Sequence, residues 1–272
     1  MKSEVVTQND IEEAMRKIGV RAGDCILVHS SLSSMGFVEG GADTVIDALL
    51  GVLGKNGTLV MPTFCQKEKE RRFDTWDIER SLSDVGKITE IFRLRPGSIR
   101  SNHATHSVAA EGRLACAITE GHVHAWGRPG PWGDAAMGIG SSWQMLYELN
   151  AEIILIGVDF HVNSMVHLIE HHITERALSG LEDVRRFGLI SRLHGWNKPG
   201  VWAGFDRMKL QNILDEMGLL SHGRCGNAPL LMVRAGSMVD TAIELMERAP
   251  REWFDDDFCN WLDESQVSEG ER

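Results

Sequence analysis

An apolar strand–helix–strand pattern, which recurs further along the chain, most constrains how this sequence can fold. Residues 25–29 and 58–63 are short apolar runs, and residues 44–53 between them repeat apolar side chains at helical spacing. Another apolar run at 152–157 precedes a helical pattern from about 163 to 178. Such units form right-handed crossovers between parallel strands. We therefore predict an α/β fold with a mixed, mostly parallel central sheet flanked by helices.

Further elements follow from capping signals and periodicity. A helix is predicted to start after Thr7-x-x-Asp10, another over 208–217, and a strand over 230–233. The motif Ser237-x-x-Asp240 is expected to open the last helix. Beyond Pro250 the periodicity stops, and we expect a tail that packs through its aromatic residues and frays at its end.

The 272 residues are expected to form one domain over 1–272, with an embellishing subdomain at about 179–225. The chain has 28 Lys and Arg residues against 39 Asp and Glu residues, a formal net charge of −11. Duplex binding depends on basic side chains that neutralise phosphates, so this balance argues against a nucleic-acid partner. The negative net charge suits a cationic ligand better than a nucleic acid.

The cysteine content and the hydropathy of the sequence indicate the cellular compartment in which the protein is expected. The five cysteines contain no Cys-x-x-Cys pair and leave one over in any full pairing, so neither a disulfide framework nor a zinc ribbon is indicated. No run approaches 18 apolar residues, and acidic residues stand where a signal peptide would be apolar. We expect a cytoplasmic protein with free thiols and no membrane partner.

The long connection at 30–41, after the first apolar run, is the first candidate site. It contains four serines and three glycines, and it leads into a helix N-terminus. Hydroxyls and backbone N–H groups in such a place suit a phosphate, and loops at the carboxyl ends of parallel strands commonly bind ligands. The loop has neither Gly-Lys-Ser/Thr nor Gly-x-Gly-x-x-Gly, so an NTP or dinucleotide is not indicated. A plain surface loop is the alternative.

The second candidate site lies on the helix predicted at 163–178. Helical spacing places His167, Glu170 and His171 on one face. An imidazole oriented by a carboxylate can act as a general base near neutral pH. An ordinary polar helix face is one alternative. Zinc binding is another, because His-x-x-Glu-His is the string of inverted zinc peptidases.

A polar segment at 100–112 carries two histidines and several hydroxyls in a stretch without periodicity. These side chains could line a cleft or cap a following helix.

Together these segments resemble the aminoglycoside 3-N-acetyltransferase family, also called the antibiotic N-acetyltransferases, whose fold differs from that of the GNAT acetyltransferases. The resemblance covers about residues 8–255 and consists of several motifs in the same order. The motifs are LVHSSLS at 27–33, GTLVMPTF at 57–64, RSNH at 100–103, LYEL at 146–149 before IILIGV at 153–158, Asn163 with HLIE at 167–170, and GNA at 226–228.

The resemblance implies transfer of the acetyl group of acetyl-coenzyme A (acetyl-CoA) to the 3-amino group of a 2-deoxystreptamine aminoglycoside, which confers antibiotic resistance. The transfer is direct and uses no metal. The implied catalytic residues are His167 as base, Glu170 beside it, and His29 near the thioester. The implied coenzyme-binding residues are Ser30, Ser31, Leu32, Ser33, Ser34, Gly36, Ser101, His103 and Ser107, and the implied acceptor-binding residues are Asp74, Asn163 and Glu170.

Two other functions remain open from the residues themselves. One is a zinc-dependent hydrolase that uses His167, Glu170 and His171. The other is a coenzyme A-binding module without transferase activity. Either a monomer or a homodimer is compatible with the sequence.

Overall fold

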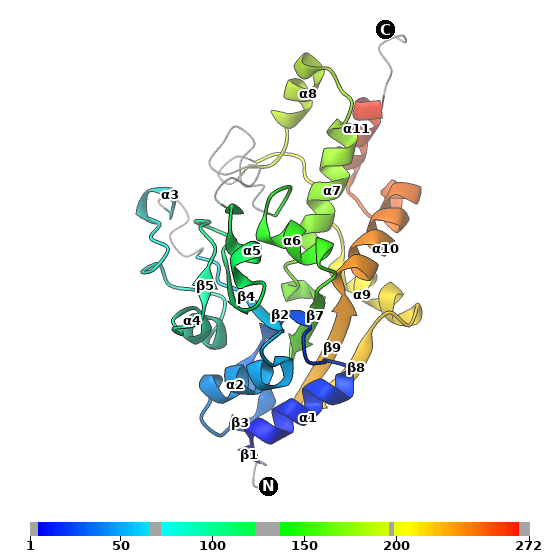
Figure 1. Ribbon diagram of the computed structural model, residues 1–272. Coiled ribbons are helices and arrows are strands. Elements are labelled where there is room, and N and C mark those ends of the chain that lie inside the picture. The colour runs from blue at the N-terminus through cyan, green and yellow to red at the C-terminus, as the bar shows by residue number, and fades with distance from the viewer. Residues whose placement is uncertain (1–4, 66–71, 123–136, 196–198, 267–272) are drawn as a thin grey trace.

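The computed structural model describes residues 5–65, 72–122, 137–195 and 199–266. Its main sheet contains seven described strands in the order β5-β6-β4-β2-β7-β9-β8 (Figure 1). Their bounds are β2 (Cys25–Ser30), β4 (Thr58–Pro62), β5 (Ile99–Arg100), β6 (Val108–Gly112), β7 (Glu152–Ile156), β8 (Ser221–Cys225) and β9 (Ala228–Arg234). Two short strands, β1 (Val5–Val6) and β3 (Phe37–Val38), pair separately and in parallel.

The α/β class and the mixed sheet are confirmed, but the expectation of a mostly parallel sheet is wrong. Only β2 with β4 and β2 with β7 pair in parallel within the described sheet. The four other pairings, toward both edges, are antiparallel. The sheet therefore has a parallel centre of three strands, whose carboxyl ends open at one edge.

Helices cover both faces of the sheet (Figure 1). One apolar cluster joins the sheet to α1, α2 and α4, and the other joins it to α5, α6, α7, α8, α9, α10 and α11. The helices are α1 (Gln8–Ile18), α2 (Ala42–Leu53), α3 (Arg72–Thr75), α4 (Lys87–Arg93), α5 (Ala115–Thr119), α6 (Ser142–Glu148), α7 (Val166–Leu178), α8 (Asp183–Ile190), α9 (Arg207–Glu216), α10 (Ala235–Arg248) and α11 (Asp256–Gln266), with short 3₁₀ turns η1 (Leu32–Met35), η3 (Phe160–Val162) and η4 (Pro250–Glu252).

The alternation of side chains along β2 explains how one strand serves both faces. Ile26 and Val28 belong to the cluster under α1 and α2, whereas Leu27 belongs to the cluster under α7 and α10. His29 is two residues beyond Leu27, so its side chain lies on the same face of the sheet, toward α7. There its ring accepts a hydrogen bond from the backbone N–H of Ser164.

The predicted start of the first helix is confirmed. Thr7 and Asp10 form the capping box of α1, and Gly19 is its C-cap. The predicted start of α10 is wrong, because this helix begins at Ala235 and Ser237 lies inside it. The prediction that periodic structure stops after Pro250 is also wrong, because α11 follows and buries Phe258 and Trp261.

Five of the described strands are not predicted by the sequence: the two-residue strands β1, β3 and β5, and the longer strands β6 and β8. The stretch after Ser107 forms β6, rather than a helix that the polar segment caps. Edge strand β8 has exposed polar residues at its centre, so it shows no apolar alternation. Among the described helices, none has both the length and the hydropathy needed to cross a membrane.

Candidate functional site

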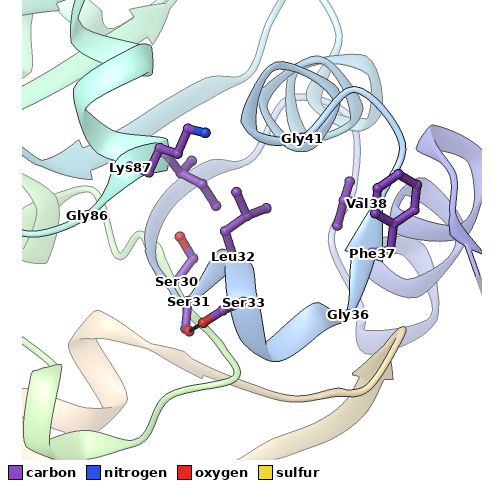
Figure 2. Close-up of a pocket in the computed structure, with 11 residues that line it drawn as sticks. Ser30, Ser31, Leu32, Ser33, Gly36, Phe37, Val38, Gly41, Gly86 and Lys87 are labelled. Atoms are coloured by element: carbon purple, nitrogen blue, oxygen red, sulfur yellow. Dashed lines mark hydrogen bonds between the residues drawn. The ribbon is translucent and has the colours of Figure 1, made fainter. Parts of the chain in front are cut away.

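The 30–41 loop encloses a cavity of about 560 Å³ at the carboxyl end of β2. Figure 2 shows the side chains of Ser30, Ser31 and Ser33 on one side of this loop cavity, with Lys87 at the start of α4 across from them. The other lining residues are Leu32, Gly36, Phe37, Val38, Gly41, Gly86 and Ile88. The structure thus brings five of the six predicted loop residues to one cavity.

Ser34 is the exception, because its hydroxyl closes the 3₁₀ turn. Its Oγ donates to the carbonyl oxygen of Ser31 at 2.7 Å. The loop packs closely over Gly157, where a Cβ would lie 1.7 Å from Ser34 Oγ. Gly36 has φ +92°, a left-handed conformation that glycine adopts without strain. The turn therefore depends on these three residues, while Ser31 and Ser33 line the cavity, with their hydroxyl oxygens 3.2 Å apart.

A second cavity of about 440 Å³, which we call the catalytic cavity, also includes Ser30 in its wall. His29 and Ser30 reach it from β2, and His167 reaches it from α7. The remaining described lining residues are Val28, Pro62, Phe64, Val85, Thr89, His106, Val158, His161, Val162, Ser164 and Arg207. The loop cavity and the catalytic cavity therefore meet at Ser30.

His167 is held by hydrogen bonds at both ring nitrogens. Its Nδ1 is 2.8 Å from Glu170 Oε2, and its Nε2 is 3.2 Å from Arg207 Nη2. Because a guanidinium can only donate, Nε2 must be the accepting nitrogen and Nδ1 must carry the proton. The His167 side chain is 34% exposed. Its proton-accepting nitrogen therefore lies on the side of the ring away from Glu170.

Glu170 lies behind His167, with its side chain 4% exposed. Its Oε2 also accepts a hydrogen bond from Trp202 Nε1 at 2.7 Å. Burial opposes ionisation of this carboxyl, but the hydrogen bonds from His167 and Trp202, together with the positive charge that His167 carries when protonated, outweigh it. They hold the pKa of Glu170 below its ordinary value. The result is an ionised carboxylate that fixes the tautomer of His167.

His29 is nearly buried and uncharged at neutral pH, because burial lowers its pKa to about 3. Its Nε2 accepts from the Ser164 N–H at 3.1 Å, so the proton lies on Nδ1. Nδ1 has no hydrogen-bond partner among the described residues. His29 can therefore donate a hydrogen bond but is a poor base.

The two histidines of the His-x-x-Glu-His string do not converge. His167 contacts Glu170 and Arg207, whereas the buried ring of His171 packs edge-on against Trp202, with ring centroids 4.9 Å apart. Within the described residues, no group of three His, Cys, Asp or Glu side chains is placed to hold a metal ion. The described geometry thus gives the zinc hypothesis no support.

Ser101, His103 and Ser107 are fully buried and line neither cavity. Ser107 Oγ donates to the carbonyl oxygen of Thr63 and accepts from Arg100 Nε. Ser101 Oγ accepts from the N–H of Val108, and His103 Nδ1 accepts from the N–H of His106. The structure places the three behind the cavity wall rather than on its surface, and a contact with the coenzyme stays a prediction.

The two other predicted acceptor-binding residues also lie off the catalytic cavity. Asn163 is buried, where its Oδ1 accepts from the N–H of Met165 and its Nδ2 contacts Met238 Sδ. It shapes the turn before α7, so its side chain is not presented to a ligand. Asp74 is exposed on the short helix α3 and lines neither cavity. Its contact with an acceptor stays a prediction.

Sequence reasoning missed Arg207, Trp202 and Lys87. Arg207 and Trp202 are distant from α7 in the sequence and contact it only through the tertiary fold. A local signal exists for Arg207 alone, because the side chain of Asp206 caps α9 and so marks Arg207 as its first residue. Lys87 is the first residue of α4, after the N-cap residue Gly86, and its position beside the serines depends on how α4 packs.

Comparison with known proteins gives the chain a family. The model of the aminoglycoside 3-N-acetyltransferase family matches residues 27–247. The SPbeta prophage-derived aminoglycoside N(3')-acetyltransferase-like protein YokD of Bacillus subtilis (strain 168) is 32% identical over 187 residues, which are 61% of this chain. The match spans 65% of the length of that relative.

Two solved structures share the fold. A mutant of aminoglycoside acetyltransferase AAC(3)-IVa in complex with a gentamicin has a TM-score of 0.74 at 23% identity, over 97% of this chain and 98% of that one. AAC-IIIb in a binary complex with CoASH has a TM-score of 0.68 at 21% identity, over 90% and 97% of the two chains. With the family model matching most of its length, the chain belongs to the aminoglycoside 3-N-acetyltransferase family.

Proposed function

We propose that this protein transfers the acetyl group of acetyl-CoA to the 3-amino group of a 2-deoxystreptamine aminoglycoside. The observation that carries the proposal is the His167–Glu170 pair, because His167 lines a cavity that meets the loop cavity at Ser30. Family membership supports the reaction class. The acidic character of the chain suits a polycationic acceptor.

The loop cavity is assigned to the coenzyme. Its hydroxyls and the ammonium group of Lys87 match the phosphates of coenzyme A, which need hydrogen-bond donors and positive charge. The thioester end then reaches Ser30, where the two cavities meet.

The acceptor amine is assigned to the catalytic cavity, with its nitrogen at His167 Nε2. An ammonium group must lose a proton before it attacks a thioester, and His167 accepts that proton while Glu170 stabilises the resulting imidazolium. His29 offers Nδ1–H to the thioester oxygen as negative charge develops there. The C–N bond forms, the C–S bond breaks, and the coenzyme leaves as the thiol.

Direct attack is favoured over an acyl-enzyme. Ser30 is the hydroxyl at the junction of the cavities, but its Oγ has no hydrogen-bond partner among the described residues. A serine nucleophile needs an adjacent base to activate it. Ser30 lacks that arrangement, so the acetyl group passes straight to the amine.

Thiol release from acetyl-CoA across a panel of aminoglycosides tests the proposal. We expect release that depends on an acceptor with a 3-amino group, and mass spectrometry should locate the acetyl group there. Coenzyme binding without release would indicate a binding module. Loss of a hydrolytic activity on chelation would indicate the zinc enzyme.

A further inference from the structure

Arg207, the first residue of α9, lies against the nitrogen of His167 that must receive the proton. Its Nη2 is 3.2 Å from His167 Nε2, and its Nη1 donates to the carbonyl oxygen of His161 at 2.8 Å. A guanidinium stays protonated and carries only donors, so Arg207 cannot itself receive a proton from His167. In this structure it fills the position that the acceptor's nitrogen has to take.

The contacts of Arg207 are ones that a ligand can replace. Both of its hydrogen-bond acceptors, His161 O and His167 Nε2, are neutral. Within the described part of the chain, no carboxylate lies within ion-pair distance of its guanidinium. Glu170 Oε2 is already shared by His167 and Trp202. Arg207 also stands at the N-terminus of α9, where the helix dipole disfavours a cation.

The charge of Arg207 nevertheless matters to the site. Burial raises the pKa of Glu170, and the positive charge of Arg207 adds to the larger effects of His167 and Trp202 that lower it. An acceptor ammonium group at His167 Nε2 would supply the same charge at the same place. Exchange of one cation for the other thus leaves the surroundings of Glu170 electrostatically similar.

From these contacts we propose that Arg207 is a positioning residue that stands in for the acceptor's ammonium group. It keeps His167 Nε2 in the accepting form and withdraws when the cationic amine binds. The inference rests on the proposed function, because it takes a cationic acceptor as the occupant of the catalytic cavity. Arg207 would then compete with the acceptor for His167, so the protein itself contains a competitor of its substrate.

Steady-state kinetics of Arg207→Met and Arg207→Lys test the inference. Without the competing cation, Arg207→Met should lower the aminoglycoside KM about fivefold or more and leave kcat within about threefold. Arg207→Lys keeps a cation and should move KM back toward the wild-type value. Arg176→Met, on the exposed face of α7 where Arg176 pairs with Glu247, is the matched control and should change neither.

A second measurement does not depend on activity. In ¹⁵N-histidine NMR spectra, the accepting Nε2 of His167 should shift in Arg207→Met as it loses a hydrogen bond, whereas Arg176→Met should leave it unchanged. A raised KM in Arg207→Met would overturn the proposal, because Arg207 would then bind the acceptor. An unmoved Nε2 resonance would overturn it as well. If wild-type protein acetylates no aminoglycoside, the proposed function fails, and the spectra still decide whether Arg207 holds His167.

Discussion

At the residue scale, two histidines of the site, His167 and His29, differ in their exposure and in their hydrogen-bond partners. His167 is about one-third exposed and has a carboxylate on Nδ1, so it can take a proton on Nε2. His29 is buried, and no carboxylate is bonded to it among the described residues. In the proposed mechanism, the same type of side chain thus serves as a base in one place and as a neutral donor in the other.

Replacing the base should abolish most turnover. We expect His167→Ala to lower kcat about a hundredfold or more with nearly unchanged coenzyme binding, because general bases contribute roughly 10²–10⁴-fold. Thiol release measures the first quantity and calorimetry the second. His222→Ala, at an exposed ion pair on β8, is the control. The zinc hypothesis makes the opposite forecast, in which His171→Ala is equally damaging and a chelator stops the reaction.

Ser31, in the 30–41 loop, should affect the binding of coenzyme A and not that of the acceptor. Ser31→Val removes a hydroxyl that lines the loop cavity, and we expect the Kd for coenzyme A to rise about tenfold to a hundredfold. Acceptor binding should stay nearly unchanged. Ser221→Val, on an edge strand outside both cavities, is the matched control. Equal coenzyme affinity in both folded variants would place the coenzyme elsewhere.

At the scale of elements, α7 carries the His167–Glu170 pair at its start and a second carboxyl with a shifted pKa, that of Glu175, about two turns after His167. Burial raises the pKa of Glu175 to about 7, against the hydrogen bond from the Ile139 backbone and the charge of Arg186. In the unfolded chain its pKa is about 4.3. The folded state therefore holds this proton longer, and the protein loses stability as pH rises from about 4.3 through about 7.

The Glu175→Gln variant should not show this loss of stability with rising pH. We expect the variant to gain a few degrees in Tm over wild type at pH 8 and little or nothing at pH 4, as measured by thermal unfolding. Glu148→Gln, on the exposed side of α6, is a control without this pH dependence. A gain of equal size at both pH values would mean that the carboxyl is not the cause.

The elements also show which parts of the fold a sequence can predict. The buried centre, β2, β4 and β7, is continuous in apolar residues, and its predicted bounds agree closely with the structure. Edge strand β8 and helix α11 escape prediction, because β8 is polar at its centre and α11 begins with two aspartates that look like a solvated tail.

The residues of the site likewise fall into a group that the sequence can predict and a group that it cannot. The Ser30–Gly36 loop and the His167–Glu170 pair are local in sequence, so spacing and resemblance could find them. The partners of His167 and Glu170 on the far side, Arg207 and Trp202, come from another part of the chain. No local pattern encodes such contacts, since they arise only when α9 and its preceding loop pack against α7.

At the scale of the whole molecule, acid stability should depend on His29. Its pKa is about 6.5 in an unfolded chain and about 3 in the fold. The unfolded state binds the proton first, so stability is complete above about pH 6.5 and is lost as pH falls toward 3. We expect His29→Gln to flatten the fall of Tm between pH 6.5 and pH 4. An unaltered slope in the folded variant would show that His29 is not buried as a neutral ring.

The position of Ser30 in the walls of both cavities has a consequence for the order of events. Under the proposed assignment of the cavities, donor and acceptor approach this junction from separate cavities, so neither has to leave before the other enters. Both substrates then occupy the protein together, and the first product appears only after both have bound. Double-reciprocal plots at several fixed acceptor concentrations should intersect rather than run parallel, and acetyl-CoA alone should give no initial burst of thiol.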